Sequence, residues 1–149
     1  MQRRMAVALL ALVGLLLSVY LTLHQLGMLG ALACGGSGSC EKVQASRWAY
    51  VAGIPVAAFG VGGYLAILAA ALAGLQDRWA EQVTPARWLV LLSSAGVLFT
   101  LYLIALEAFV IHAWCRWCLG SSVIIGLIFV LSVLDWRATR AAAQPSLSS

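Results

Sequence analysis

The chain has 149 residues, of which 63% are hydrophobic and only 9% are charged, and its mean hydropathy is +0.98. A soluble domain of this size carries about 25% charged residues, so the composition excludes a water-soluble fold and predicts that lipid solvates most of the chain. The net charge of +4 comes from dispersed Lys and Arg residues, which favours a role in membrane orientation over nucleic-acid binding.

Four apolar stretches predict membrane-spanning helices. A helix rises about 1.5 Å per residue, so roughly 20 residues cross the hydrocarbon core. The last stretch reaches this length only if its helix begins near Cys115, which places Cys115 and Cys118 in the first turn. We therefore expect one all-α domain over residues 1–149, an integral membrane four-helix bundle with spans at about residues 5–23, 55–75, 89–111 and 115–134.

The first stretch also has features of a signal peptide, because it follows Arg3 and Arg4 and precedes ALAC at residues 31–34. The apolar region of a signal peptide runs for about 7–15 residues, and this stretch is longer, so we expect it to remain as the first span. Small residues recur at every fourth position in the first two spans, which indicates close helix packing. They are Gly14, Ser18, Thr22, Gly62, Ala66, Ala70 and Gly74.

The connection at residues 25–54 is a sizeable loop that contains two of the four cysteines. Cys34 and Cys40 flank the sequence GGSGS. Because glycine admits many backbone conformations, this ring can close a disulfide and can also swing towards another thiol.

The third stretch contains Glu107, an acidic residue deep in a predicted span and about two helical turns from Cys115. Intramembrane carboxylates are costly and usually functional. Proton handling and a structural hydrogen bond to a neighbouring helix remain equal alternatives. His24 and His112 stand at helix ends. A pair of histidines can ligate haem, but interfacial histidines more often form local hydrogen bonds, which is the interpretation we favour.

The distribution of basic residues predicts the orientation. With four crossings, both termini and the loop at residues 76–88 share one side, which carries six basic residues against three on the other. The positive-inside rule then places both termini in the cytoplasm of a cell membrane and all four cysteines on the outer face, where disulfides persist. The tail at residues 138–149 has no apolar period and contains Pro145, so we expect it to be disordered.

Cys115 and Cys118 lie in the sequence HAWCRWC. Neither cysteine pair would close a long loop, so neither would add much stability as a structural disulfide. Five residues separate Cys34 from Cys40, which does not match the usual spacing of zinc ligands. Short Cys-x-x-Cys rings are typical of disulfides that are made and broken repeatedly. We therefore favour a redox relay over inert disulfides, and we expect no metal site.

The predicted position of this late pair also indicates activated thiols. Unpaired N–H groups and the macrodipole at a helix N-terminus favour negative charge, and Arg116 adds a formal positive charge. Both effects lower the pKa of a thiol and populate the thiolate, which is the attacking form. Beside the lipid phase, such a pair can meet a lipid-soluble electron acceptor.

Four segments together resemble the vitamin K epoxide reductase family, particularly its bacterial members: LLLSVYLTLH, CGGSGSCEKVQASRW, GIPVAAFGVGGY and LYLIALEAFVIHAWCRWC. The resemblance extends from Leu15 to Ser122. Its specific elements are the loop pair, Ser46 followed by Arg47 and Trp48, and the late Cys-x-x-Cys.

The resemblance implies a bundle around a quinone, either ubiquinone or menaquinone, with Cys118 facing it. Cys115 would exchange with the loop pair, and the loop pair with a thioredoxin-fold partner that acts in trans. Ser46 would lie near the quinone on a short helix along the membrane surface. Separately from the resemblance, the position of Phe59 one turn into the second predicted span makes it a candidate for the pocket lining, and core packing explains it at least as well. The implied activity is a membrane thiol oxidant that supplies disulfides to exported proteins.

Two departures from the animal enzymes bear on the substrate. Those enzymes carry a tyrosine four residues after the last cysteine, where this chain has Ser122, and an asparagine at the start of the second helix, where this chain has Val56. Both are polar groups associated with the vitamin K head group. Reduction of vitamin K quinone or epoxide is therefore the alternative interpretation, and a structural membrane protein with inert disulfides is the non-enzyme alternative.

Overall fold

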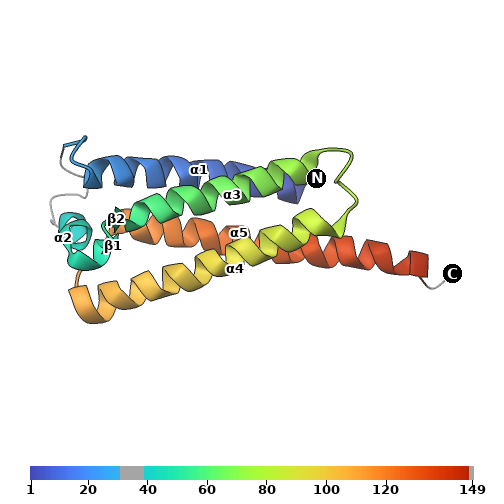
Figure 1. Cartoon of the computed structure of the whole chain (residues 1–149). Coiled ribbons are helices and arrows are strands. Elements are labelled where there is room, and N and C mark those ends of the chain that lie inside the picture. Colours follow the sequence, from blue (N-terminus) through green and yellow to red (C-terminus); the bar gives the residue numbers. More distant parts are fainter. Residues whose placement is uncertain (31–38, 148–149) are drawn as a thin grey trace.

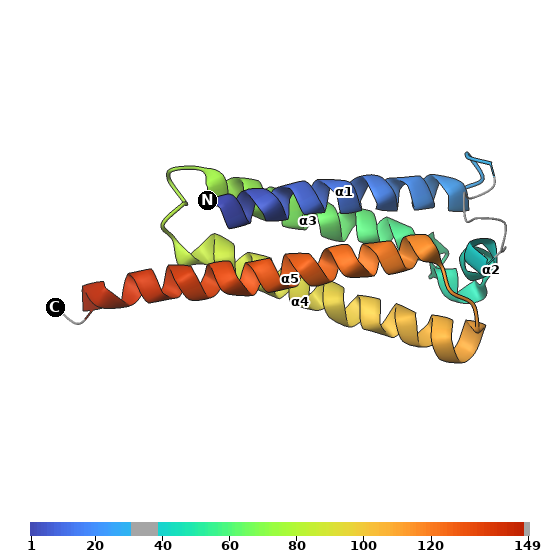
Figure 2. The same ribbon diagram turned by 180° about the vertical axis from the view of Figure 1, so that it is seen from behind.

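The computed structural model describes residues 1–30 and 39–147, and within them four long helices lie side by side (Figures 1 and 2). Helix α1 packs against α3 and α5, and α4 packs against the same two helices. Each is long and apolar enough to cross a membrane, so the all-α bundle and its multi-pass character are confirmed. The helices are α1 (Gln2–Gln25), α3 (Val56–Leu75), α4 (Val83–Leu106) and α5 (Arg116–Ala143).

Two helices extend by six residues or more beyond the spans that hydropathy predicts. Helix α4 begins at Val83 rather than near residue 89, because Pro85 falls in its first turn, where a missing N–H breaks no helical hydrogen bond. Helix α5 continues to Ala143, so residues 138–143 are helical and not part of a disordered tail. Alanine favours helix, and the Arg140 guanidinium lies 5.4 Å from the Trp136 ring centroid on this segment.

The core of the bundle is narrow and apolar. Val7, Tyr64, Ile67, Leu89 and Ile128 are buried in one cluster, while many large apolar side chains point outward from the bundle. Such an outer surface is favourable in lipid and costly in water. The exposed apolar side chains include Leu9, Leu16, Leu98, Phe109 and Val123.

The small residue Gly14 permits the close approach of α1 and α3, because a Cβ at this position would overlap the Tyr64 ring. This contact confirms part of the predicted small-residue packing. A Cβ on Gly62 of α3 would have no neighbouring atom within 4 Å. The small size of Gly62 therefore serves no packing contact within the bundle.

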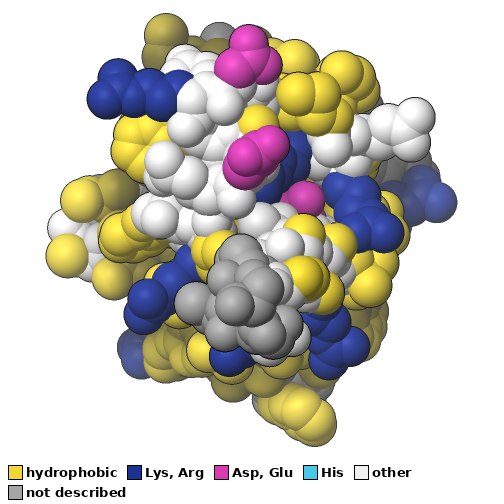
Figure 3. Space-filling view, turned by 90° about the vertical axis from the view of Figure 1, so that its right-hand side faces the viewer, with side chains coloured by type: hydrophobic (Ala, Val, Ile, Leu, Met, Phe, Trp, Pro, Cys, Tyr) yellow, Lys and Arg dark blue, Asp and Glu magenta, His cyan; other side chains and the backbone are white. Residues whose placement is uncertain are grey.

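A buried ion pair joins the helices at the end that holds both chain termini. Arg4 Nε lies 2.8 Å from Asp135 Oδ2, which ties α1 to α5. The Arg4 guanidinium also donates to the carbonyls of Gly74 at 2.6 Å and Ala80 at 3.1 Å. Figure 3 looks onto this end, where basic side chains, all of them Arg, lie around the rim.

The opposite end is covered by the connection between α1 and α3. It contains α2 (Ser39–Ala45), a 3-10 turn at Arg47–Ala49, and the two-residue strands β1 (Tyr50–Val51) and β2 (Ile54–Pro55), which pair antiparallel (Figure 1). The predicted short helix in the cysteine loop is therefore confirmed. This cap brings Cys40 to the end of the bundle where α5 begins.

Candidate functional site

Cys115 is placed by the turn that connects α4 to α5. Helix α4 widens into a π-helical turn at Glu107–Ile111, which ends at His112 in the left-handed conformation with φ 54°. Such π turns often occur at functional sites. Cys115 follows as the N-cap of α5, one residue before the helix rather than inside its first turn, and its Sγ accepts a hydrogen bond from the Cys118 N–H at 3.4 Å.

The Cys115 thiol is fully buried, and hydrogen bonds lower its pKa from an ordinary 9.0 to about 7. The Cys118 thiol makes the largest contribution, and the Cys118 backbone N–H and the Gln44 amide add to it. Burial and the charge of Glu107 act in the opposite direction. The Arg116 side chain is exposed, so donors at the helix N-terminus account for the activation that the sequence predicts.

Cys40 and Cys115 belong to one buried cluster, which also contains Leu21, Val43 and Ala113. Cys40 is disulfide-bonded, whereas Cys115 and Cys118 are free thiols. Cys34, the other predicted member of the loop pair, lies outside the described residues. The cap therefore brings a sulfur of the loop into the same apolar cluster as the helix pair.

Gln44 joins the two cysteine segments and was not singled out by sequence reasoning. Its side chain is 7% exposed, and its Nε2 lies 3.5 Å from Cys118 Sγ and 3.8 Å from Cys115 Sγ. Gln44 follows Cys40 by four residues, which places the two side chains on one face of a short helix. That spacing was the available signal.

Beneath the cysteines lies a cavity of about 380 Å³ with mostly apolar walls. Cys118 lines it, as do Ser46 and Phe59, the two other residues predicted near a ligand, and Glu107, the candidate for proton handling. Cavities of this size and character hold small apolar ligands. The ring of Phe59 is half exposed and lies 6.5 Å from the Phe99 ring, between centroids, so it borders the cavity instead of packing in the core.

The cavity suits a quinone head group, which is a flat ring with two carbonyl oxygens. Phe59 and Phe99 supply aromatic walls, and Cys118 supplies the reactive sulfur. Gln25 also lines the cavity, and its Oε1 is buried without a hydrogen-bond partner in the protein. A buried polar atom without a partner in the protein can be satisfied by a water or a ligand bound in the cavity.

Glu107 lies much closer to the cysteines than its two-turn separation suggests. The carboxylate is 3% exposed, and its Oε2 accepts a hydrogen bond from the Cys115 N–H at 3.2 Å. The chain reverses at His112 and brings Cys115 back over the π turn. Glu107 therefore makes a structural hydrogen bond, as one of the two alternatives predicted, but its partner is the backbone of the connection to α5 and not a neighbouring helix.

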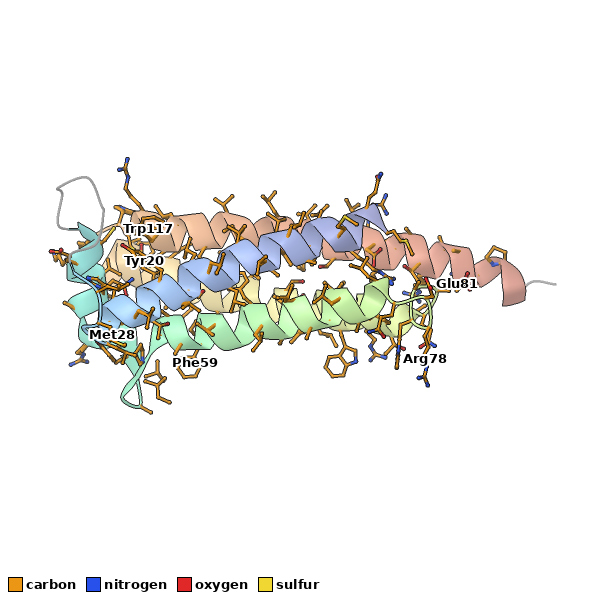
Figure 4. All side chains as sticks on the ribbon, turned by 90° about the horizontal axis from the view of Figure 1, so that it is seen from above. Tyr20, Met28, Phe59, Arg78, Glu81 and Trp117 are labelled. Atoms are coloured by element: carbon orange, nitrogen blue, oxygen red, sulfur yellow. The ribbon has the colours of Figure 1, made fainter. Side chains whose placement is uncertain are left out.

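The other singled-out polar residues lie around this end of the bundle. Ser46 precedes the 3-10 turn, and its hydroxyl donates to the Val43 carbonyl at 2.8 Å. His24 lies in the last turn of α1 with a buried, unpartnered Nδ1, and His112 is exposed. Tyr20 and Trp117 meet close to the pair, with ring centroids 5.5 Å apart (Figure 4).

The fold and this site agree with a comparison against known protein families. The chain matches the model of the vitamin K epoxide reductase family over residues 5–133, which include α3, α4 and the cysteine cap and most of α1 and α5. The described geometry has the features that such chemistry requires: a Cys-x-x-Cys pair at an apolar cavity and a loop cysteine beside it. The chain therefore belongs to the vitamin K epoxide reductase family, whose members are oxidoreductases that use cysteines and a quinone.

Proposed function

We propose that this protein is a membrane thiol oxidant that drives disulfide formation in exported proteins. Electrons enter at Cys34 and Cys40 from a thioredoxin-fold partner in trans, pass to Cys115 and Cys118, and leave on a membrane quinone. One observation supports this route above the others: Cys118 lines the apolar cavity, while Cys115 shares a buried cluster with Cys40.

The relay consists of three balanced exchanges. The partner dithiol reduces the loop disulfide and becomes oxidised itself. A loop thiolate then attacks the Cys115 sulfur of the helix disulfide, and the electron pair of that bond goes to Cys118. The second loop thiol attacks the mixed disulfide and releases Cys115. The helix dithiol finally gives two electrons and two protons to the quinone and becomes a disulfide again.

The two helix cysteines divide the work because they face different surroundings. Cys118 is partly exposed to the cavity, where a hydrophobic quinone ring from the lipid would bind. Cys115 is fully buried beneath the cap and has the lowered pKa that an exchanging thiol needs. Ubiquinone and menaquinone both meet the chemical requirement of an apolar, two-electron acceptor.

Glu107 is proposed to handle protons at the same site. Its carboxyl lines the cavity, holds the Cys115 backbone and lies within hydrogen-bonding reach of the Cys118 thiol. Each turnover moves two protons from the dithiol to the quinone, so a carboxyl between sulfur and cavity is well placed to accept and pass them.

The proposed orientation puts the cysteine end outside the cytoplasm of a cell, or inner, membrane. Arg3, Arg78, Arg87, Arg137 and Arg140 are exposed at the end that holds both termini. Basic residues are retained on the cytoplasmic side. The cap then faces an oxidising compartment that contains exported proteins and their thiol oxidants.

Reduction of a vitamin K-type epoxide is the less favoured reaction. Val56 and Ser122 line the cavity at the two positions where the animal enzymes carry polar head-group contacts. Valine offers no hydrogen bond, and the Ser122 hydroxyl already donates to the Cys118 carbonyl at 2.8 Å. The inert-disulfide alternative is set aside because members of the family are oxidoreductases.

A reconstituted assay tests the proposal. Purified protein in lipid vesicles is mixed with a reduced thioredoxin-fold protein and either ubiquinone or menaquinone, and quinone absorbance is followed over time. We expect loss of quinone in step with oxidation of the partner, no turnover in Cys118→Ala, and turnover retained in the control Ser94→Ala, a serine of α4 outside the cavity lining. Equal quinone loss in wild type and Cys118→Ala would refute the route.

A further inference from the structure

Gln44 carries the further inference, because it is the side chain through which the cap touches both sulfurs of the helix pair. We propose that Gln44 is a positioning residue: its amide N–H groups stabilise sulfur anions at Cys115 and Cys118, so the helix that carries Cys40 also carries one of the donors that activate its exchange partner. The inference rests on the proposed relay and deepens it by naming a residue that regulates exchange.

The geometry gives one amide group two sulfur acceptors. Gln44 Nε2 lies 3.5 Å from Cys118 Sγ and 3.8 Å from Cys115 Sγ, both within the range of hydrogen bonds to sulfur. The amide is nearly removed from water at 7% exposure, which strengthens such bonds. Cys40 begins the same turn of α2 and is 1% exposed in the shared cluster.

Cys118 on α5 also donates to Cys115, through its thiol and its backbone N–H, but the groups outside α5 do not replace Gln44. Glu107, on the π turn, accepts a hydrogen bond from the Cys115 N–H, and its negative charge raises the pKa of the Cys115 thiol. Tyr20, on α1, packs against the cluster that contains Cys115. His112 and Arg116, which flank Cys115 in the chain, are exposed. Among the described residues, Gln44 is the side chain outside α5 that donates to these sulfurs.

This arrangement ties thiolate stability to the position of α2. When a loop thiolate attacks Cys115, the helix disulfide breaks and its electron pair goes to Cys118, which receives the Gln44 hydrogen bond. Leaving thiols of lower pKa depart faster, and stabilising a reduced pair makes it a better oxidant. If α2 moved away from Cys115 and Cys118, the Gln44 donor and Cys40 would leave together, because both lie on α2.

The direct test measures the Cys115 thiol alone, in the full chain in lipid. Cys34, Cys40 and Cys118 are replaced by serine, which leaves one thiol and keeps a hydroxyl donor at residue 118. The rate of alkylation is followed against pH in this parent and with Gln44→Leu or Gln44→Glu added. The midpoint of the rate against pH reports the pKa of the Cys115 thiol. The plateau at high pH reports how accessible the thiolate is to the reagent, so a change of packing is distinguished from a change of pKa.

We expect both Gln44 variants to shift the midpoint upward and to slow alkylation at neutral pH by about fivefold, with Gln44→Glu shifting it further because it adds an anion. Glu41→Gln is the matched control, since Glu41 is an exposed residue on α2, and its midpoint should not move. Equal midpoints in the parent, Gln44→Leu and Gln44→Glu would overturn the inference, as would an equal shift in Glu41→Gln.

A second measurement uses the intact helix pair, with only Cys34 and Cys40 replaced by serine. Equilibration in glutathione buffers should show that Gln44→Leu disfavours the reduced pair by about fivefold in the equilibrium constant. An unchanged constant contradicts the inference. Neither readout needs quinone or partner. Failure of quinone turnover would therefore refute the proposed function and leave the Gln44 result intact, and unchanged thiol readouts would refute the role of Gln44 and leave quinone turnover intact.

Discussion

The Glu107 carboxylate accepts a hydrogen bond from the Cys115 N–H at 3.2 Å, eight residues further along the chain. This contact fixes the connection that presents Cys115 to the cap and Cys118 to the cavity. It also separates two roles for Glu107 that a substitution can distinguish, because glutamine can still accept the N–H but cannot carry a proton at neutral pH.

The first prediction therefore compares Glu107→Gln with Glu107→Leu. We expect Glu107→Gln to keep the fold and the backbone hydrogen bond but to slow quinone reduction by about a hundredfold or more, the usual size of an acid–base contribution, and to alter its pH profile. Glu107→Leu should also lower thermal stability, since it leaves the buried Cys115 N–H unpaired. Unchanged turnover and pH profile in Glu107→Gln would leave Glu107 a structural role alone.

The second prediction concerns pH. Because the pKa of Cys115 is lowered from 9.0 to about 7, its thiolate is present above that value and is lost as the pH falls through it. Alkylation of the reduced wild-type protein, followed by peptide mass spectrometry, should show Cys115 modification rising between about pH 6 and pH 8. A midpoint at the ordinary thiol value would contradict the hydrogen-bond account.

The third prediction concerns the ion pair between Arg4 and Asp135, whose side chains are 4% and 11% exposed. Removing one partner leaves a buried charge unpaired, so Asp135→Leu should destabilise the bundle by about 3 kcal/mol. The double variant Arg4→Met with Asp135→Leu should recover much of that loss. Thermal unfolding in detergent measures both, and Arg3→Met is the control at an exposed neighbour.

The fourth prediction concerns helix packing. A Cβ on Gly14 would overlap the Tyr64 ring, so Gly14→Ala should force α1 and α3 apart and cost about 1–3 kcal/mol. Gly62→Ala on α3 has open space and should be neutral or slightly stabilising. Equal unfolding temperatures for the two variants would show that the close contact is not required.

Hydropathy predicts the bundle because membrane spans need long apolar helices whatever their packing. Exact boundaries depend on local chemistry: Pro85 fits an early α4 start, and the alanines before Ala143 prolong α5. The cysteine pairs could be chosen from their spacing alone. The family resemblance added Ser46, and the position of Phe59 one turn into the second span made it a candidate; both line the cavity.

The contacts of Glu107 and Gln44 could not be predicted, because each depends on a reversal of the chain. The first needs the π turn and the left-handed His112, and the second needs α2 to fold over the start of α5. Neither reversal leaves a periodic signal in the sequence. An uncharged glutamine in a polar loop is also a common residue, which only its spacing from Cys40 distinguishes.

The most direct test of the relay is whether a loop sulfur can bond to the helix pair. In a protein with Cys34→Ala and Cys118→Ala, Cys40 and Cys115 are left as the two thiols, and they lie in one buried cluster. After mild oxidation in lipid, peptide mass spectrometry should find Cys40 linked to Cys115 in most molecules. If both cysteines remain separately alkylatable, electrons have no path from the loop to the cavity, and the account is contradicted.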